Sequence, residues 1–320
     1  MNYTKLSVFN NKEKLYEMWN EEFGSLFPIT KELFERNTND ICDDASYVAL
    51  DHDKVVGFII GKTWESNFVI GDYEDSGWIS LIYVHPKYRN KGIGTKLLEL
   101  AETEFDRLNK KIIHIGRDYN DFFPGLPIAL GSPLEWFEKR GYIKPYDTCD
   151  LINKNKEKIA LKNKDLEYRL ATLDDKEKIL QFMERNWPGR WTKETIDYWS
   201  NGGTGREYLI CIENSKVIAF AKIGYPDTSE CLIGNSQTWR GHFKALGGIG
   251  PLGVDKDCRG RHIGFDIVAE GKNILIDANA SDIIIDWTGL TDFYARFGFE
   301  LWESYHYLTK TKKRRLKNEI

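Results

Sequence analysis

The chain has 320 residues, of which 41% are hydrophobic and 29% are charged, and this composition excludes a largely disordered or fibrous protein. Its formal net charge of −4 gives no overall attraction for nucleic acid, so no nucleic-acid partner is expected. The longest clean apolar run, Val55–Ile60, is far shorter than the ~20 residues that cross a bilayer, so we expect no membrane span.

The first half of the chain mixes helical and strand patterns. A long amphipathic helix is predicted over 91–108, because apolar residues from Ile93 to Phe105 recur at helical spacing. The remaining elements are expected in this order: helices at 11–20 and 30–40, strands near 46–51, 54–62 and 78–84, a buried strand at 111–115, a short helix near 133–140 and a closing strand.

The second half repeats this order and three of its motifs. Its expected elements are a strand at 166–171, a helix at 174–186, strands at 207–213, 216–223 and 249–254, a helix at 261–278, a strand at 282–286, a helix at 291–297 and a last strand. The recurring motifs are 53–61 with 215–222, 84–94 with 254–264, and 136–142 with 293–299. A shared order indicates duplication. We therefore expect two copies of one unit, 1–153 and 165–320, joined by a polar linker.

The most informative segment follows the strand that ends near Val84. Pro86 stops strand pairing, and glycines at 92 and 94 then open a helix. The first N–H groups of a helix have no intrahelical partner and form an anion site suited to a diphosphate. A Walker A loop fits worse because Thr95-Lys96 stands in reverse order, and a dinucleotide fingerprint fits worse because Leu97 replaces its third glycine.

This segment, V-H-P-K-Y-R-N-K-G-I-G-T-K-L-L (84–98), resembles the acyl-CoA loop of the GNAT superfamily of N-acyltransferases. W-F-E-K-R-G-Y (136–142) resembles the late helix-to-strand step of the same family, and the whole chain resembles a tandem GNAT protein. The resemblance implies an α/β (α+β) fold with two tandem domains. Each would have a mixed, mostly antiparallel sheet, helices on both faces and a splayed central strand pair.

The resemblance also implies acetyl-CoA as co-substrate. No metal is expected, because the six histidines lack metal-ligand spacing such as HExxH. An amine of a small molecule or peptide would attack the thioester directly, and a strand backbone N–H would stabilise the oxyanion. The residues that would hold acetyl-CoA are Ile82, Tyr83 and Val84 along its pantetheine arm, and Arg89, Asn90, Lys91, Gly92, Ile93, Gly94 and Thr95 around its diphosphate.

Each copy departs from the family pattern at one position. The tyrosine that commonly protonates the departing thiolate is Phe137 in the first copy and Tyr294 in the second. The first loop glycine is Gly92 in the first copy and His262 in the second, where a β-carbon would crowd a diphosphate. Either the first copy reacts with another proton donor or none, or the second copy catalyses and tolerates His262.

Tyr294 and Asp118 are the candidate catalytic residues. Asp118 lies in the loop 116–127 after the buried strand, where it could anchor or deprotonate an amine. The alternative to an N-acetyltransferase is an inert module that binds acyl-CoA or a partner protein.

Other features suggest where the protein works. Five cysteines without a CxxC pair and a start without an apolar signal region favour a cytoplasmic protein. A monomer or a homodimer is expected. The basic run Lys310–Lys317 is expected to be a solvated chain end.

Overall fold

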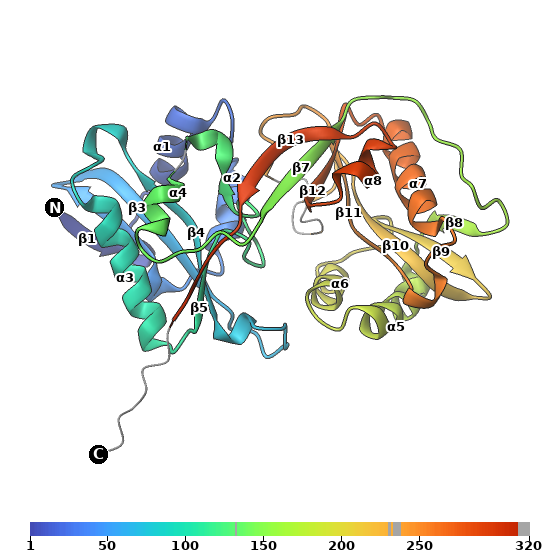
Figure 1. Cartoon of the computed structure of the whole chain (residues 1–320), viewed down its shortest axis with the longest axis horizontal. Helices are drawn as coiled ribbons and strands as arrows, with labels where there is room; N and C mark the ends of the chain where they lie inside the picture. The colour runs from blue at the N-terminus through green and yellow to red at the C-terminus, as the bar shows by residue number, and fades with distance from the viewer. Residues whose placement is uncertain (132, 230–231, 233–237, 313–320) are drawn as a thin grey trace, which may run out of the picture. The chain divides into compact units, whose positions relative to one another are not determined.

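The chain forms two compact units, and neither unit is one continuous stretch of sequence. Figure 1 shows a computed structural model of the protein, which describes residues 1–131, 133–229, 232 and 238–312. The first unit contains residues 1–23, 34–148 and the segment that begins at Tyr305, and the second contains 24–33 and 149–304. These units differ from the contiguous ranges 1–153 and 165–320 expected from the sequence.

The first unit is built on a six-stranded sheet. In spatial order its strands are β1 (Asn2–Lys5), β2 (Tyr47–Asp51), β3 (Lys54–Thr63), β4 (Ser76–Val84), β5 (Ile112–Ile115) and β14 (Leu308–Thr311). Only β4 and β5 pair in parallel, and all other neighbours are antiparallel. The expected mixed, mostly antiparallel sheet is confirmed.

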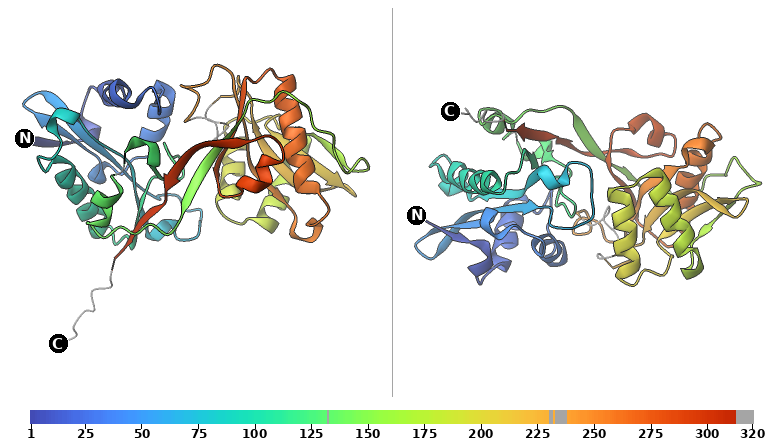
Figure 2. Two further views of the ribbon diagram at one scale, coloured as in Figure 1. Left: turned by 45° about the horizontal axis from the view of Figure 1, so that its top comes forward. Right: turned by 90° about the horizontal axis from the view of Figure 1, so that it is seen from below.

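Helices cover both faces of this sheet, as expected. The helices are α1 (Glu13–Phe23), α2 (Lys31–Thr38), α3 (Ile93–Arg107) and α4 (Leu134–Glu138). Ile59 of β3 belongs to the core beneath α3, whereas Phe58 stacks on Tyr83, which contacts Trp19 of α1. Consecutive strand residues face opposite sides of a sheet, so α3 and α1 lie on opposite faces (Figure 2, right).

The second unit repeats this plan. Its sheet has the order β13 (Glu300–His306), β7 (Asp147–Asn153), β12 (Asp282–Thr288), β11 (Leu246–Val254), β10 (Lys216–Gly224), β9 (Tyr208–Glu213) and β8 (Glu167–Leu170). Strands β11 and β12 are parallel, while β7–β12, β10–β11, β9–β10 and β8–β9 are antiparallel pairs. The two-residue strand β6 (Leu126–Pro127) pairs with the end of β13 within the first unit.

The helices of the second unit are α5 (Lys176–Asn186), α6 (Arg190–Ser200), α7 (Ile263–Asp277) and α8 (Thr291–Ala295). Ala221 packs in one core with α7, and its neighbour Phe220 packs in another core with α5 and α6. Helix α6 was not expected from the sequence. The apolar spacing of Trp191, Tyr198 and Trp199 signals this helix, because these residues recur on one face.

The two sequence copies exchange their closing strands. Strand β14, from the end of the chain, pairs with β5 in the first unit from Leu308↔Ile115 to Thr311↔Ile112. Strand β7, from the first copy, pairs with β12 in the second unit, for example Ile284↔Ile152. The exchanged strands pair with residues far away in the sequence, and the local pattern of a strand does not indicate which distant strand it will pair with.

Two charged segments are more ordered than the sequence suggested. Lys310 lies in β14 and its ammonium is 2.8 Å from the Glu102 carboxylate, so the basic run does not begin as a solvated end. Residues 313–317 of that run lie outside the described residues. The expected linker is held along α7, where the side chain of Asn273 bonds both the N–H and the carbonyl of Ile159 at 2.9 Å.

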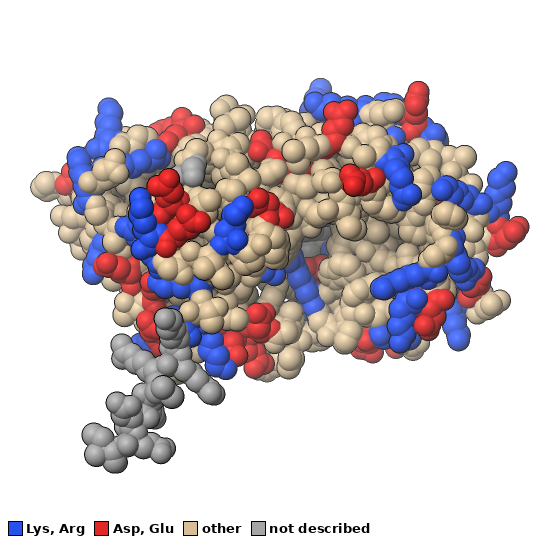
Figure 3. All heavy atoms as spheres, in the orientation of Figure 1, with Lys and Arg blue, Asp and Glu red and all other residues tan. Residues whose placement is uncertain are grey.

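The sequence predicted neither a membrane span nor a metal site, and the structure can be searched for both in its described residues. Within them, the helices are too short or too polar to cross a bilayer, and no group of His, Cys, Asp or Glu side chains is arranged to hold a metal ion. Four cysteines there are free thiols, and Cys231 lies outside the described residues. On the face drawn in Figure 3, basic and acidic side chains are interspersed.

The strand exchange predicts that the chain end stabilises the first unit. Leu308 is fully buried in the core beneath α3, so Leu308→Ala should lower the free energy of unfolding by about 2–5 kcal/mol. Leu301→Ala, at an exposed position of β13, should change it by less than about 0.5 kcal/mol. Denaturant titration measures both values, and amide exchange should locate the loss of protection in β5. Loss confined to β12 and β11 would contradict the exchange.

A buried histidine also connects β5 to the chain end. The two ring nitrogens of His114 lie 3.2 Å from the Ser76 hydroxyl and 3.1 Å from the Tyr307 hydroxyl. Burial, assisted by the nearby Arg117 charge, lowers the pKa of His114 to about 4. The folded state therefore holds this imidazole neutral at pH values where an unfolded chain protonates it.

This pKa gives the first unit a defined pH dependence. The unfolded state binds the proton first, so His114 should reduce stability as pH falls from ~6.5 to about 4, by up to about 3 kcal/mol. His114→Asn should flatten the dependence in that window, as measured by chemical unfolding at several pH values. His52→Asn, at an exposed side chain, is the control. An equal slope in wild type and His114→Asn would contradict the prediction.

Candidate active site

Strands β4 and β5 of the first unit part after a short stretch of pairing. Their parallel register runs from Ser76↔Ile112 to Ile79↔Ile115, and the last contact is the Gly116 N–H to Ile79 carbonyl bond of 2.9 Å. Strand β4 continues to Val84 without β5 beside it. This confirms the expected splayed strand pair and leaves residues 80–84 of β4 without a strand partner on that edge.

A β-bulge lies where the strands part. On the other side of β4, Leu81 pairs with Ile60 and Ile79 pairs with Gly61, so Ser80 has no opposite residue on β3. A bulge re-aims the backbone of one strand and is common next to active sites. Ser80 thus lies at the apex of the opening, between the two interrupted ladders.

The turn after β4 leads directly into α3. Pro86 starts a 3-10 turn, Asn90 and Gly92 have φ of +60° and +80°, and Gly92 caps the helix. The Lys96 N–H donates to the Gly92 carbonyl at 2.9 Å. The N–H groups of Ile93, Gly94 and Thr95 come before this bond in the helix, so they have no intrahelical acceptor. A β-carbon added at Gly92 would meet no atom within 4 Å. The loop thus offers unobstructed backbone donors to an anion.

The side chains proposed to assist this loop have other partners. The guanidinium of Arg89 bonds both oxygens of Glu22 at 2.7–2.8 Å and the Val84 carbonyl at 2.8 Å. The ammonium of Lys91 bonds the Lys87 carbonyl at 3.1 Å. The anion site therefore consists mainly of backbone.

Arg140 lies beside the start of α3 and was not among the residues expected from the sequence. It follows α4 and donates to the Thr95 hydroxyl at 2.7 Å, while its guanidinium stacks on Trp136 at 3.9 Å. Its Nε atom is buried and has no hydrogen-bond partner among the described residues. Arg140 stands in the motif 136–142, but only the folded chain brings it to the first turn of α3.

The three strand residues expected to meet a ligand differ in orientation. Ile82 and Val84 pack against the core beneath α3. Tyr83 is buried on the opposite face among aromatic rings from α1 and β3, and burial together with Glu22 raises the pKa of its phenol. The His85 N–H donates to the Val56 carbonyl of β3, and backbone groups alternate between the two edges of a strand, so Ile82 and Val84 direct their backbone groups to the unpaired edge of β4.

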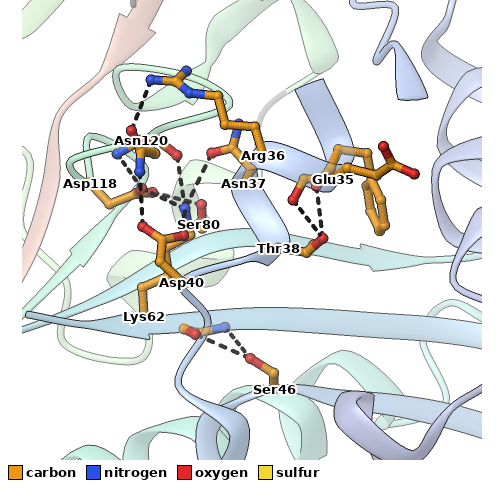
Figure 4. A network of polar contacts seen from close by, with 12 residues as sticks. Glu35, Arg36, Asn37, Thr38, Asp40, Ser46, Lys62, Ser80, Asp118 and Asn120 are labelled. Atoms are coloured by element: carbon orange, nitrogen blue, oxygen red, sulfur yellow. Dashed lines mark hydrogen bonds and ion pairs between the residues drawn. The ribbon is translucent and has the colours of Figure 1, made fainter. Parts of the chain in front are cut away.

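Asp118 lies inside a polar network at the apex (Figure 4). Its carboxylate accepts bonds from the Ser80 hydroxyl at 2.6 Å and the Lys62 ammonium at 2.9 Å. It also accepts the Asn120 N–H at 3.1 Å. Asp118 and Lys62 are about 1–2% exposed. The expected residue is thus beside the opening, but as half of a buried ion pair.

The second unit has the same backbone with different side chains at the helix start. Its strands β11 and β12 also part after three pairs, and the bulge falls at Gly250–Pro251, where proline removes a backbone donor. His262 caps α7 with φ of +61°, the left-handed conformation that Gly92 adopts in the first unit. The β-carbon of His262 therefore occupies space that Gly92 leaves open.

Three further changes fill this second helix start. Phe265 and Phe297, at the positions of Thr95 and Arg140, pack with ring centroids 4.7 Å apart. Asp266 is fully buried in the first turn and accepts the N–H groups of Lys162 and Asn163 at 2.7 and 3.0 Å. A buried carboxylate opposes the binding of a phosphate, so this end of α7 is a poor anion site.

The two positions that correspond to the family's proton-donating tyrosine lie in different units. Phe137 is buried in the first unit, against Trp136 and Tyr142. Tyr294 is buried in the second unit, where burial and the charge of Asp286 raise the pKa of its phenol to about 12. Tyr294 is thus protonated at neutral pH. It does not belong to the unit that keeps the open anion loop.

Comparison with known proteins finds one family. The model of the acetyltransferase (GNAT) family matches the chain at residues 12–122 and again at 176–299. No curated protein matches the chain.

Solved structures with the same fold include tandem proteins. A glucosamine N-acetyltransferase region of a fungal multi-domain β-N-acetylglucosaminidase has a TM-score of 0.84 and 23% identity over 96% of this chain, which spans 38% of that protein. An N-acetyltransferase from Sphaerobacter thermophilus has a TM-score of 0.66 and 16% identity, covering 93% of this chain and 90% of its own. A tandem GNAT protein of clavulanic acid biosynthesis has a TM-score of 0.66 and 11% identity, covering 97% and 98%.

Proposed function

Because the chain belongs to the acetyltransferase (GNAT) family, we propose that its first unit transfers an acetyl group from acetyl-CoA to an amine of a small molecule or peptide. The observation that carries this proposal is the open edge of β4 leading into the Gly92 helix start. The edge supplies backbone groups for an extended amide-bearing arm, and the helix start supplies donors for a diphosphate. Both ends of acetyl-CoA therefore find a chemically suitable partner in one unit.

The reaction needs little from side chains. The amine nitrogen attacks the thioester carbonyl, the carbon–sulfur bond breaks, and the CoA thiolate leaves and takes a proton. The amine, with an ordinary pKa near ~10.4, loses one proton before attack and a second afterwards. Since Phe137 cannot protonate the thiolate, water or the acceptor's own proton completes the step in this unit.

The second unit is proposed to have no acetyl-CoA site of its own. His262 narrows the loop, Asp266 places a negative charge in the first turn, and Phe297 replaces the arginine. Each change removes one part of an anion site that the first unit keeps. We keep 1–153 and 165–320 as the two proposed sequence copies, although their strands are exchanged.

Amino sugars are the first acceptor class to test. The fungal structural neighbour is described as a glucosamine N-acetyltransferase region and matches nearly the whole chain. Polar groups of Asn37, Asp40 and Asn120 gather near the apex of the first unit, where an acceptor would approach the thioester (Figure 4). Free CoA release with glucosamine, polyamines and peptide amines measures the acceptor preference. Acetyl-CoA binding without turnover across these amines would instead favour an inert acyl-CoA-binding module.

Matched substitutions assign the binding site to one unit. Gly94→Asp adds a carboxylate that suits the helix dipole but repels a diphosphate, and its β-carbon would make only ordinary contacts of 3.5–3.7 Å. We expect at least tenfold weaker acetyl-CoA binding by calorimetry, and loss of turnover. Gly264→Asp, at the matching position of α7, has a similar contact at 3.5 Å and should leave binding within about twofold.

The opposite pattern would place the reaction in the second unit. In that case Gly264→Asp and Tyr294→Phe would abolish turnover, and Gly94→Asp would have little effect. Equal loss from both aspartate variants would mean that both helix starts bind acetyl-CoA.

Arg140 should contribute charge to the same site. Arg140→Gln keeps a hydrogen-bonding group near Thr95 but removes the positive charge, so acetyl-CoA affinity should fall about five- to twentyfold, and less at high salt. Lys139→Gln, an exposed neighbour paired with Glu135, is the matched control. Isothermal titration at two salt concentrations measures the difference. An unchanged affinity in Arg140→Gln would remove this residue from the site.

A further inference from the structure

The buried Lys62–Asp118 pair contacts Ser80 of β4. At this residue the pairing of β4 is interrupted on both sides, with β3 and with β5. Ser80 has no partner opposite it on β3, and the pairing of β4 with β5 ends at Ile79. The hydroxyl of Ser80 donates to Asp118 at 2.6 Å, so the network holds the bulge through its side chain. We propose that Asp118 is a positioning residue that fixes the Ser80 bulge for acyl transfer, and that it is not the general base.

The ammonium of Lys62 on β3 contacts groups from three other segments. It lies 2.9 Å from Asp118 Oδ1, 2.8 Å from the Asn120 carbonyl, 3.2 Å from Asn37 Oδ1 and 3.1 Å from Asp40 Oδ1. These groups come from the end of α2, the segment after it and the loop after β5, while Lys62 itself lies on β3. A fully satisfied network of this kind rigidifies its members.

The same contacts make Asp118 a poor base. Its two oxygens already accept bonds from Ser80, Lys62 and Asn120. A proton taken from the amine would neutralise the carboxylate and leave Asp40, at 3.1 Å, as the remaining counter-ion of the Lys62 ammonium. Asp40 is partly exposed and more strongly screened than Asp118, so losing the buried partner is unfavourable. We therefore expect the proton of the amine to leave by another route.

A fixed bulge matters because the reacting carbonyl would lie beside it. The proposal rests on the proposed function, in which a backbone N–H of β4 stabilises the oxyanion. Removing one such donor costs about 10²–10³-fold in rate, and a misplacement of about 1 Å costs a similar factor. In the proposed function the diphosphate binds at the start of α3, away from the bulge. The rate can therefore fall in either way while the binding of acetyl-CoA stays unchanged.

The test measures the ¹³C resonance of the thioester carbonyl in bound acetyl-CoA, so it does not require that any amine be acetylated. Acetyl-CoA labelled with ¹³C at the acetyl carbonyl is bound to the full-length protein, and its resonance is compared with that of the free compound. A hydrogen bond to the carbonyl shifts the resonance downfield. Ser80→Ala should return it toward the free value while the dissociation constant stays within about threefold. The matched control, Ser76→Ala, removes a buried hydroxyl from the paired part of the same strand and should leave the shift in place.

Kinetics then separate positioning from base catalysis. Ser80→Ala should lower kcat about 10–100-fold. The double variant Lys62→Gln/Asp118→Asn has no charge to serve as a base but retains an acceptor for Ser80. In a plot of kcat/KM against pH, the fall on the acid side (the acid limb) should occur at the same apparent pKa in this double variant as in the wild type.

The outcomes distinguish this inference from the proposed function. A wild-type protein that binds acetyl-CoA without acetylating any amine refutes the function, and the carbonyl resonance still decides the inference. An unchanged resonance in Ser80→Ala, or loss of the acid limb in the double variant with binding intact, overturns the inference alone. Absence of acetyl-CoA binding in the wild type overturns both.

Discussion

The interrupted pairing of β4 and β5 is the constraint on which the site of the first unit depends. Backbone N–H and carbonyl groups inside a protein need hydrogen-bond partners, and β4 continues for five residues after its last pair with β5. The bulge at Ser80 turns the strand at this point, and the turn after Val84 presents the first N–H groups of α3 at the end of the same edge. The unpaired strand edge and the helix start thus both present backbone groups, and side chains such as Ser80 and Arg89 hold the segments that carry them.

The two units show that this backbone can persist after its chemistry changes. His262 adopts the left-handed conformation of Gly92 although that region is unfavourable for most side chains by about 1–2 kcal/mol. Around it, the second unit has an aromatic pair and a buried carboxylate where the first has Thr95, Arg140 and Lys96. These contacts fasten the segment around Asn163 to α7. The replaced groups stabilise the fold, whereas their counterparts in the first unit leave backbone donors accessible.

The features that could be predicted from the sequence are those set by residues close together in the chain. The strand, proline, glycines and helix of 84–98 follow one another along the chain, and the splayed pair came from the resemblance they carry. The Lys62–Asp118 pair joins residues 56 apart, Arg89 bonds a carboxylate 67 residues away, and Arg140 reaches Thr95 across 45. No local spacing encodes such contacts. Arg89 was therefore assigned to the anion, Asp118 was considered without its lysine, and Arg140 was overlooked.

The exchange of closing strands gives the second copy a structural role in the first unit. Strand β5 forms one side of the opening in the first unit, and its outer edge is covered by β14, which comes from the second copy. Without β14, β5 would be an exposed edge strand of four residues, free to shift or to pair with another chain. The contacts of Lys310 with Glu102 and of Tyr307 with His114 add side-chain bonds to this pairing. The second copy therefore supplies the strand that holds β5 in register, and this role depends on its last strand and not on its own helix start.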